Sequence, residues 1–99
     1  MQREAELAFI KLHILHHAAK EEVYGAGLME ELARHGYRIG AGVMYPALAK
    51  MEKQSLISCR TENVGGKQRK YYRITENGRE LLAEMKLKVE ELHEELNED

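Results

Sequence analysis

The chain has 99 residues, a formal net charge of −2, one cysteine and no tryptophan. This length suits one small domain and is too short for a second, and a lone cysteine excludes an intrachain disulfide framework and suits a reducing compartment. The sequence contains no apolar run near the roughly 20 residues of a membrane span and no charged-then-apolar leader. We therefore expect a soluble cytoplasmic protein that has no membrane partner.

The charge is distributed unevenly along the chain. Residues 1–74 carry 12 Lys/Arg and 8 Asp/Glu, a net of +4, whereas residues 75–99 carry 3 and 9, a net of −6. Between residues 50 and 74 there are seven cations and two acids. Because neutralisation of phosphates by Lys and Arg supplies most of the sequence-independent affinity for DNA, this local basic segment favours a nucleic-acid partner. The acidic C-terminal segment is expected to be a solvated helix held away from the DNA.

Two helices are predicted at the start of the chain. Over residues 4–20, apolar side chains recur at spacings of three and four, which is the helical rather than the strand period. Residues 25–35 show a shorter apolar pattern of the same kind, and His35-Gly36 is a typical stop signal for that helix.

A third helix is expected from Gly42 to about Gln54. Its apolar positions recur at steps of four and three, at Met44, Leu48 and Met51. Pro46 lacks a backbone N–H, which is harmful inside a helix but harmless in the first turn, where that group has no partner anyway. We therefore expect the helix to begin just before Pro46.

A β-hairpin is predicted next. Residues 56–62 alternate apolar with polar side chains, as a half-buried strand does, and residues 68–74 form the returning strand. Residues 63–67, which include Gly65 and Gly66, are expected to make the turn between them.

A final helix follows, for which Thr75 is a suitable N-cap and Gly78 an unexplained weak position in the first turn. Its apolar residues have the a/d spacing of a coiled-coil seam: Leu82, Met85, Val89, Leu92 and Leu96. Two heptads are too short to be stable alone, so the seam needs a partner, either the first helix or a second copy of the final helix.

The order of these elements predicts a mainly α fold with a small β-hairpin. It is the order of a winged helix-turn-helix DNA-binding domain, residues 1–74, followed by a dimerisation helix, residues 75–99.

Several short sequence pieces follow one another in a specific order and spacing. They are Gly42-Val43-Met44-Tyr45-Pro46-Ala47-Leu48, Met51-Glu52, Leu56-Ile57, and Arg69-Lys70-Tyr71-Tyr72-Arg73-Ile74-Thr75 with Gly78. Through them, over roughly residues 5–82, the chain resembles the PadR family of bacterial winged-helix transcriptional regulators. The short length and single terminal helix resemble the compact subfamily.

The resemblance implies a homodimer that binds an inverted repeat in double-stranded DNA, usually as a repressor, and that a small molecule releases in some members. It also implies that the third helix enters the major groove while the hairpin, or wing, contacts the backbone or minor groove. The residues expected to contact DNA are Gly42, Val43, Tyr45, Lys50, Lys53, Lys67, Arg69 and Lys70.

Several of these assignments have alternatives. Tyr45 can reach a phosphate or fill the core between the helices, and Lys50 and Lys53 can belong to a solvated helix face. Where the family often has Thr, Val43 cannot donate a hydrogen bond, and we expect it to contact a thymine methyl group instead. Ser55 stands where glycine is common after the helix, which predicts a slightly strained C-cap.

The seam residues Leu82, Met85, Val89, Leu92 and Leu96 are expected to hold the dimer together. An effector, if the protein has one, is expected between the first and last helices of the two subunits, at Phe9, Leu12, Met85 and Val89. Flexible methionines there would adapt to a small, planar aromatic molecule.

Two sensing roles are weaker alternatives. His13 and His17 lie one helical turn apart and could chelate a metal with His93 of a second copy, but no second cysteine or carboxylate completes the spacing. We therefore assign no metal or cofactor. Cys59 is interpreted as a small core residue, with redox sensing as its alternative.

The sequence does not predict an enzyme. It offers no nucleophile with a plausibly spaced base, no paired carboxylates in an apolar setting and no phosphate-binding glycine loop after a strand. The remaining alternative from another class is a protein-interaction module in which the winged helix is a scaffold and the last helix docks a partner protein.

Overall fold

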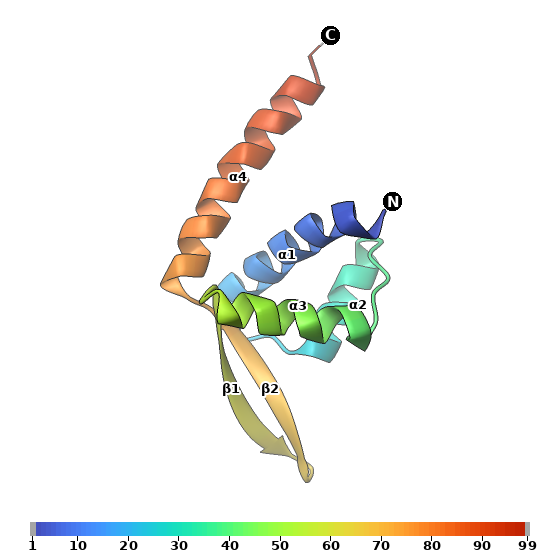
Figure 1. Cartoon of the computed structure of the whole chain (residues 1–99), viewed down its shortest axis with the longest axis vertical. Coiled ribbons are helices and arrows are strands. Elements are labelled where there is room, and N and C mark those ends of the chain that lie inside the picture. Colours follow the sequence, from blue (N-terminus) through green and yellow to red (C-terminus); the bar gives the residue numbers. More distant parts are fainter. Residues whose placement is uncertain (1, 99) are drawn as a thin grey trace.

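The computed structural model describes residues 2–98 as four helices and a two-stranded antiparallel hairpin (Figure 1). The elements are α1 (Arg3–Lys20), α2 (Gly25–Arg34), α3 (Ala41–Lys53), β1 (Ile57–Val64), β2 (Lys67–Ile74) and α4 (Glu76–Leu96). The predicted order of elements and the mainly helical class are confirmed. Within the described residues, no helix combines the length and the apolar character that crossing a membrane requires.

The hydrophobic core lies between the first three helices and the base of the hairpin. Each helix turns one apolar stripe inward, because residues spaced three and four apart share a helix face. The largest fully buried side chains are Ile10, Ile14, Leu15, Leu28, Leu32, Met44, Leu48 and Ile57. Ile57, Tyr72 and Ile74 join this core from the hairpin, whereas residues 60–70 are exposed. The wing is therefore fixed at its base and solvated along its length.

The hairpin is longer and its turn is tighter than predicted. The register runs from Ile57 opposite Ile74 to Val64 opposite Lys67, which leaves Gly65 and Gly66 as a two-residue turn. Both glycines have positive φ, 57° and 82°, as the tight turns that match strand twist require. The predicted turn over residues 63–67 was thus too long, because glycines at both central positions allow the strands to pair up to the turn.

The predicted start of α3 at Gly42 was one residue late, and the predicted start just before Pro46 was wrong. The helix begins at Ala41, so Pro46 lies inside it, beyond the first turn. The Gly40 carbonyl accepts hydrogen bonds from the backbone N–H groups of Val43 and Met44, at 3.1 and 3.0 Å, and so the first turn forms without a side-chain cap. Pro46 cannot donate to the carbonyl of Gly42. The chain tolerates this loss because Gly42 is exposed and water can reach its carbonyl.

The end of α3 confirms the strained C-cap. Ser55 has a φ of 61°, in the left-handed region that glycine usually occupies. The N–H of Leu56 donates to the Met51 carbonyl at 3.0 Å, and the N–H of Ser55 donates to the Glu52 carbonyl at 2.9 Å. These two bonds turn the chain sharply from α3 into β1.

The start of α4 explains the glycine that the sequence left unexplained. Thr75 caps the helix as predicted, since its Oγ1 accepts a hydrogen bond from the N–H of Gly78 at 3.0 Å. Gly78 is buried, and a Cβ at this position would overlap the backbone carbonyl of Leu56 and a side-chain carbon of Ile74. Glycine is therefore needed where α4 crosses the entrance to β1.

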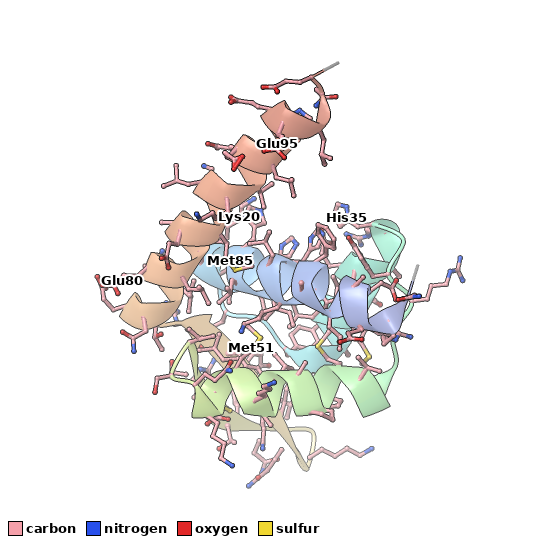
Figure 2. The ribbon with its side chains drawn as sticks, turned by 45° about the horizontal axis from the view of Figure 1, so that its top comes forward. Lys20, His35, Met51, Glu80, Met85 and Glu95 are labelled. Atoms are coloured by element: carbon pink, nitrogen blue, oxygen red, sulfur yellow. The ribbon has the colours of Figure 1, made fainter. Side chains whose placement is uncertain are left out.

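The last helix packs on the body for part of its length. Leu81, Leu82 and Met85 are partly buried against the core, and α4 contacts α1. Met85 lies where α4 meets α1, whereas Glu95 lies near the far end of α4 (Figure 2). Beyond this contact the helix extends away from the body (Figure 1), and Leu96 is 73% exposed.

Candidate nucleic-acid interface

A groove of about 700 Å³ lies between α3 and the hairpin, and we call it the α3–wing groove. Its lining comes from the start of α2, one flank of α3 and the outer part of the hairpin: Tyr24, Gly25, Ala26, Tyr45, Ala49, Glu52, Val64, Lys67, Gln68, Arg69, Lys70 and Tyr72. The hairpin points away from the body on the side opposite the free end of α4 (Figure 1). Four of the residues predicted to contact DNA lie together in this groove: Tyr45, Lys67, Arg69 and Lys70.

The other predicted contacts lie elsewhere on α3. Gly42, Val43 and Lys50 line a second, more apolar groove of about 360 Å³ between α1 and α3. Val43 is half-buried there, whereas Lys50 and Lys53 are exposed. The predicted residues of α3 therefore divide between two flanks of the helix, with Tyr45 on the flank that faces the wing.

The outward side of α3 carries mostly small side chains. With 3.6 residues per turn, the positions opposite the buried stripe are Gly42, Pro46, Ala49 and Lys53, and all four are exposed. Small side chains leave the backbone of this helix accessible. Sequence reasoning missed Pro46 and Ala49 as candidates, although the helical period combined with the buried positions could have found them.

Tyr45 does not fill the core, since its side chain is 45% exposed. Its ring lies against Gly25, the first residue of α2, where an added Cβ would come within 2.6 Å of the ring and the hydroxyl oxygen. The absence of a side chain at Gly25 thus lets the Tyr45 ring and its hydroxyl lie beside the start of α2, where Tyr45 lines the α3–wing groove.

The cations of the wing are exposed, and one of them is held in place. Lys67, Arg69 and Lys70 are all solvent-exposed. The guanidinium carbon of Arg69 lies 4.5 Å from the centroid of the Tyr24 ring, which is a cation–π contact. Glu52, on α3, is the acid that faces these cations across the groove.

A segment before α2 fastens the wing to the body, and sequence reasoning missed it. Val23 forms an antiparallel bridge to Tyr72, with N–H to O distances of 2.9 and 2.8 Å. This isolated bridge is a single residue pair that joins the segment before α2 to β2. Burial raises the pKa of Tyr72 to about 12, so its phenol stays protonated at neutral pH.

An ion pair supports the same junction. The Arg60 guanidinium donates two hydrogen bonds to the Glu22 carboxylate, at 2.6 and 2.7 Å, and it stacks on Tyr71 at 4.6 Å. These hydrogen bonds lower the pKa of Glu22 and raise that of Arg60. Arg60 was counted among the basic residues of this segment, but its charge is matched within the chain. No local pattern could have revealed a partner 38 residues away.

A family model described as the transcriptional regulator PadR-like family matches residues 14–84. The chain belongs to the PadR-like family. One relative of this PadR-like chain is "Transcriptional regulator Rv3488" of Mycobacterium tuberculosis (strain ATCC 25618 / H37Rv), which is 46% identical over 94 residues that cover 95% of the chain and 88% of the relative.

Solved PadR-family structures share the fold. A PadR-like transcriptional regulator from Bacillus cereus is 35% identical, has a TM-score of 0.81, and is matched over 91% of this chain and 89% of its own. A PadR family transcriptional regulator from Eggerthella lenta is 32% identical, with a TM-score of 0.84 and coverage of 94% and 82%. The chain is therefore a transcriptional regulator with a winged-helix fold and is not an enzyme, as the sequence predicted.

In this PadR-like chain, the predicted dimerisation residues fall into two groups along α4. Leu82 and Met85 are half-buried against the body of the same chain. Val89, Leu92 and Leu96 are exposed, and the exposed fraction rises from 43% to 50% and 73% toward the end of the helix. The first helix of the same chain therefore covers only the beginning of the seam.

Three of the predicted effector residues border one groove. Phe9, Leu12 and Val89 line a mainly apolar groove of about 520 Å³ between α1 and α4. The other lining residues are His13, His16, Leu82, Lys86 and Glu90. Met85 packs against the core instead. The groove is open, and 47% of the Phe9 side chain is exposed.

The residues considered for sensing are also placed by the fold. Cys59 is half-buried against the core, which agrees with its interpretation as a small core residue. His93 lies in the last turn of α4 beside Asn97, with 3.3 Å between the Asn97 amide nitrogen and His93 Nδ1. His13 and His17 instead lie beside His35, which sequence reasoning had used only as a helix stop.

Proposed function

We propose that this chain is a homodimeric repressor that binds an inverted-repeat operator in double-stranded DNA. In this proposal α3 enters the major groove, and the wing contacts the phosphate backbone or the adjacent minor groove. Residues 1–74 form the DNA-binding part and residues 75–99 the dimerisation helix. A regulator of this kind acts in the cytoplasm, where its operator lies.

The observation that carries the proposal is the α3–wing groove. An α-helix fits the major groove of B-DNA, and the cations of a neighbouring wing then reach the phosphates beside it. Here the exposed side of α3 carries small residues, and one of them, Ala49, borders the α3–wing groove together with Lys67, Arg69 and Lys70. The acidic α4 extends on the other side of the molecule (Figure 1), where it does not repel the DNA.

The exposed seam of α4 supports a dimer. Val89, Leu92 and Leu96 form an apolar stripe that residues 2–98 cover only in part. A second copy of α4, or the α1 of a second copy, would bury this stripe by the same a/d packing that the sequence predicts. In the proposed dimer, a two-fold axis through these helices would relate the two copies of α3. Half-sites about one helical turn apart then match the pair.

The α1–α4 groove supports release by a small aromatic effector. Its lining is mainly apolar, with Phe9 available to stack on a ring. An occupant there would change how α4 lies on α1. Because α4 is the proposed dimer contact, the spacing between the two copies of α3 would change with it.

The proposal is tested by selection from a random duplex pool at moderate salt, with the molecular mass measured by size-exclusion chromatography on the same sample. Enrichment of an inverted repeat by a dimer is the expected result. A monomer that retains no duplex even in low salt would contradict the proposal. A dimer that retains all duplexes equally would contradict its sequence-specific part.

A further inference from the structure

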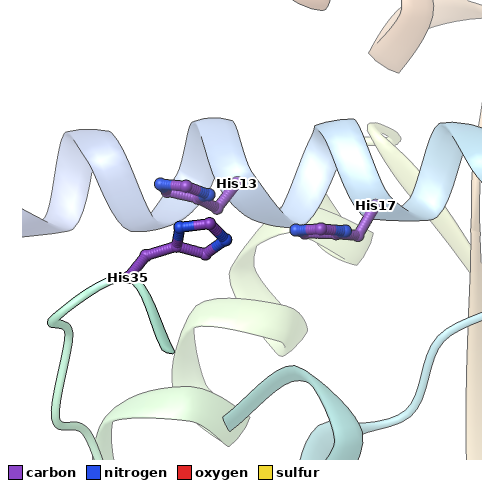
Figure 3. Close-up of side chains that lie close together, drawn as sticks. All are labelled: His13, His17 and His35. Atoms are coloured by element: carbon purple, nitrogen blue, oxygen red, sulfur yellow. The ribbon is translucent and has the colours of Figure 1, made fainter. Parts of the chain in front are cut away.

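Three histidines from two helices meet on the side of α1 that faces α2. His13 and His17 lie one turn apart on α1, and His35 is the C-cap residue of α2. Figure 3 shows the three rings side by side between the helices, with His35 closest to His13. One ring nitrogen from each can be chosen so that all three lie within 4.8 Å of one another. We call this group the three-histidine cluster.

One nitrogen of the cluster lacks a partner. The Nε2 of His17 is buried, and among residues 2–98 no group forms a hydrogen bond with it. The nearest acid oxygen is Oε1 of Glu31, 3.8 Å away, which is within ion-pair range but too long for a hydrogen bond. A buried polar nitrogen without a partner costs free energy, and a metal ion bound to His17 Nε2 would remove that cost.

The surroundings of His13 favour its neutral form, which is the form that binds metals. Burial lowers the pKa of His13, and the nearby charges of His35 and His17 lower it further. The rings lie close together, with centroids 5.0 Å apart for His13 and His35 and 6.2 Å apart for His13 and His17. A neutral imidazole has one ring nitrogen with a free lone pair, which can bind a metal ion.

A carboxylate stands next to the three rings. Glu31 Oε1 lies 3.5 Å from His35 Nε2 and 3.8 Å from His17 Nε2, while its Oε2 accepts a hydrogen bond from Arg34 at 2.8 Å. The C-terminal end of α2, where His35 sits, carries the negative end of the helix dipole. Both features favour a cation at this place.

We propose that His13, His17 and His35 bind a divalent transition metal of the class that prefers imidazole, such as Zn²⁺ or Ni²⁺, with Glu31 as the adjacent carboxylate. In tetrahedral zinc sites the metal–nitrogen distance is about 2.0–2.1 Å, which places ligand nitrogens about 3.3 Å apart. Small side-chain rotations bring the three nitrogens from within 4.8 Å to that spacing. Glu31 then occupies the fourth position or orients a ligating ring.

This site differs from the one that the sequence suggested. His35 comes from the same chain and replaces His93 of a second copy. The cluster residues are absent from the lining of the α3–wing groove, so metal binding and DNA binding are separable. A bound metal would join α1 to the end of α2 and hold the two helices at a fixed distance.

The test is a calorimetric titration of Zn²⁺ into the full-length chain without an affinity tag, near neutral pH. The expected result is one metal per chain, with binding at least about tenfold weaker in each of His13→Ala, His17→Ala and His35→Ala. His93→Ala is the matched control, because it removes a histidine outside the cluster and should leave the affinity unchanged. Absence of binding by the unmodified chain would overturn the proposal.

His35→Ala is the decisive variant, because His35 is exposed and its removal should leave the fold intact. Its circular dichroism and its melting temperature in EDTA should match those of the unmodified chain. Zn²⁺ should raise the melting temperature of the unmodified chain but not that of His35→Ala. An equal rise in both proteins, or loss of binding in His93→Ala, would place the metal elsewhere and refute the site.

Discussion

The phenol ring of Tyr45 on α3 lies against Gly25, the first residue of α2, so closely that a Cβ on Gly25 would come within 2.6 Å of it. Tyr45 borders the α3–wing groove, and its orientation is therefore set by a missing side chain on a neighbouring helix. This relationship joins the two helices of the helix-turn-helix at the proposed DNA surface.

Gly25→Ala should turn the Tyr45 ring away and weaken operator binding by roughly tenfold, about 1.4 kcal/mol, with a smaller effect on stability. Binding is measured by fluorescence anisotropy with the selected operator. The double-mutant cycle with Tyr45→Ala is the control, since Gly25→Ala should have no further effect once the ring is gone. Additive losses from the two substitutions would show that the ring and Gly25 act independently.

Gly78→Ala should destabilise the chain by roughly 1–3 kcal/mol, because the new Cβ overlaps the backbone carbonyl of Leu56 and the backbone must shift. Gly42→Ala is the matched control near the start of another helix. An added Cβ there meets nothing within 4 Å, so alanine should stabilise α3 by about 0.5–1 kcal/mol. Chemical denaturation measures the free energy of unfolding of both variants. Equal changes in the two variants would contradict the close packing of Gly78.

Replacing Lys67, Arg69 and Lys70 together by alanine should flatten the salt dependence of operator binding. For B-DNA, the slope of log K against log salt falls by roughly 0.9 for each phosphate that the protein no longer neutralises. Lys88→Ala, an exposed cation on α4, is the control and should leave the slope unchanged. An unaltered salt slope in the triple variant would show that these cations of the wing do not contact DNA phosphates.

Leu92→Glu should convert the proposed dimer into a monomer, because it places a charge in the apolar seam. Leu92 is exposed in the single chain, so the fold should survive the substitution. Leu87→Glu is the matched control, since Leu87 is also exposed but lies on the opposite face of α4 by helical periodicity. Analytical ultracentrifugation distinguishes the outcomes, and dimerisation by Leu92→Glu would contradict the seam.

Stability should fall as the pH drops below about 6.5, measured in EDTA. The pKa of His13 in the folded chain is lowered, chiefly by burial and then by the charges of His35, His17 and His16, while Glu31 opposes this shift. As the pH falls, the unfolded chain therefore takes up a proton before the folded chain does. Protonation stabilises the unfolded chain, and the free energy of unfolding decreases. Thermal melts at several pH values measure how the stability of the folded chain depends on pH.

His13→Gln should flatten part of this pH dependence because glutamine does not titrate. The burial that lowers the pKa of His16 contributes in the same direction, so some dependence should remain. His93→Gln, at the far end of α4, is the control. An unchanged slope in His13→Gln would show that His13 does not couple folding to pH in this range.

The sequence by itself determined the elements whose signals are local. The apolar periods placed the four helices, the paired glycines placed the hairpin, and Thr75 marked the start of α4. These features depend on residues within one or two turns of each other, so their pattern is readable along the chain. The cations of the wing were found in the same way, as a local run of charge.

Only the tertiary structure decided which distant residues meet. It joined His35 to His13 and His17, Glu22 to Arg60, and Tyr24 to Arg69. It also placed Val43 on the flank of α3 that faces α1, and it showed why Gly78 has no side chain. Such contacts depend on how the helices and the hairpin pack in three dimensions, and packing leaves no periodic mark in a single sequence.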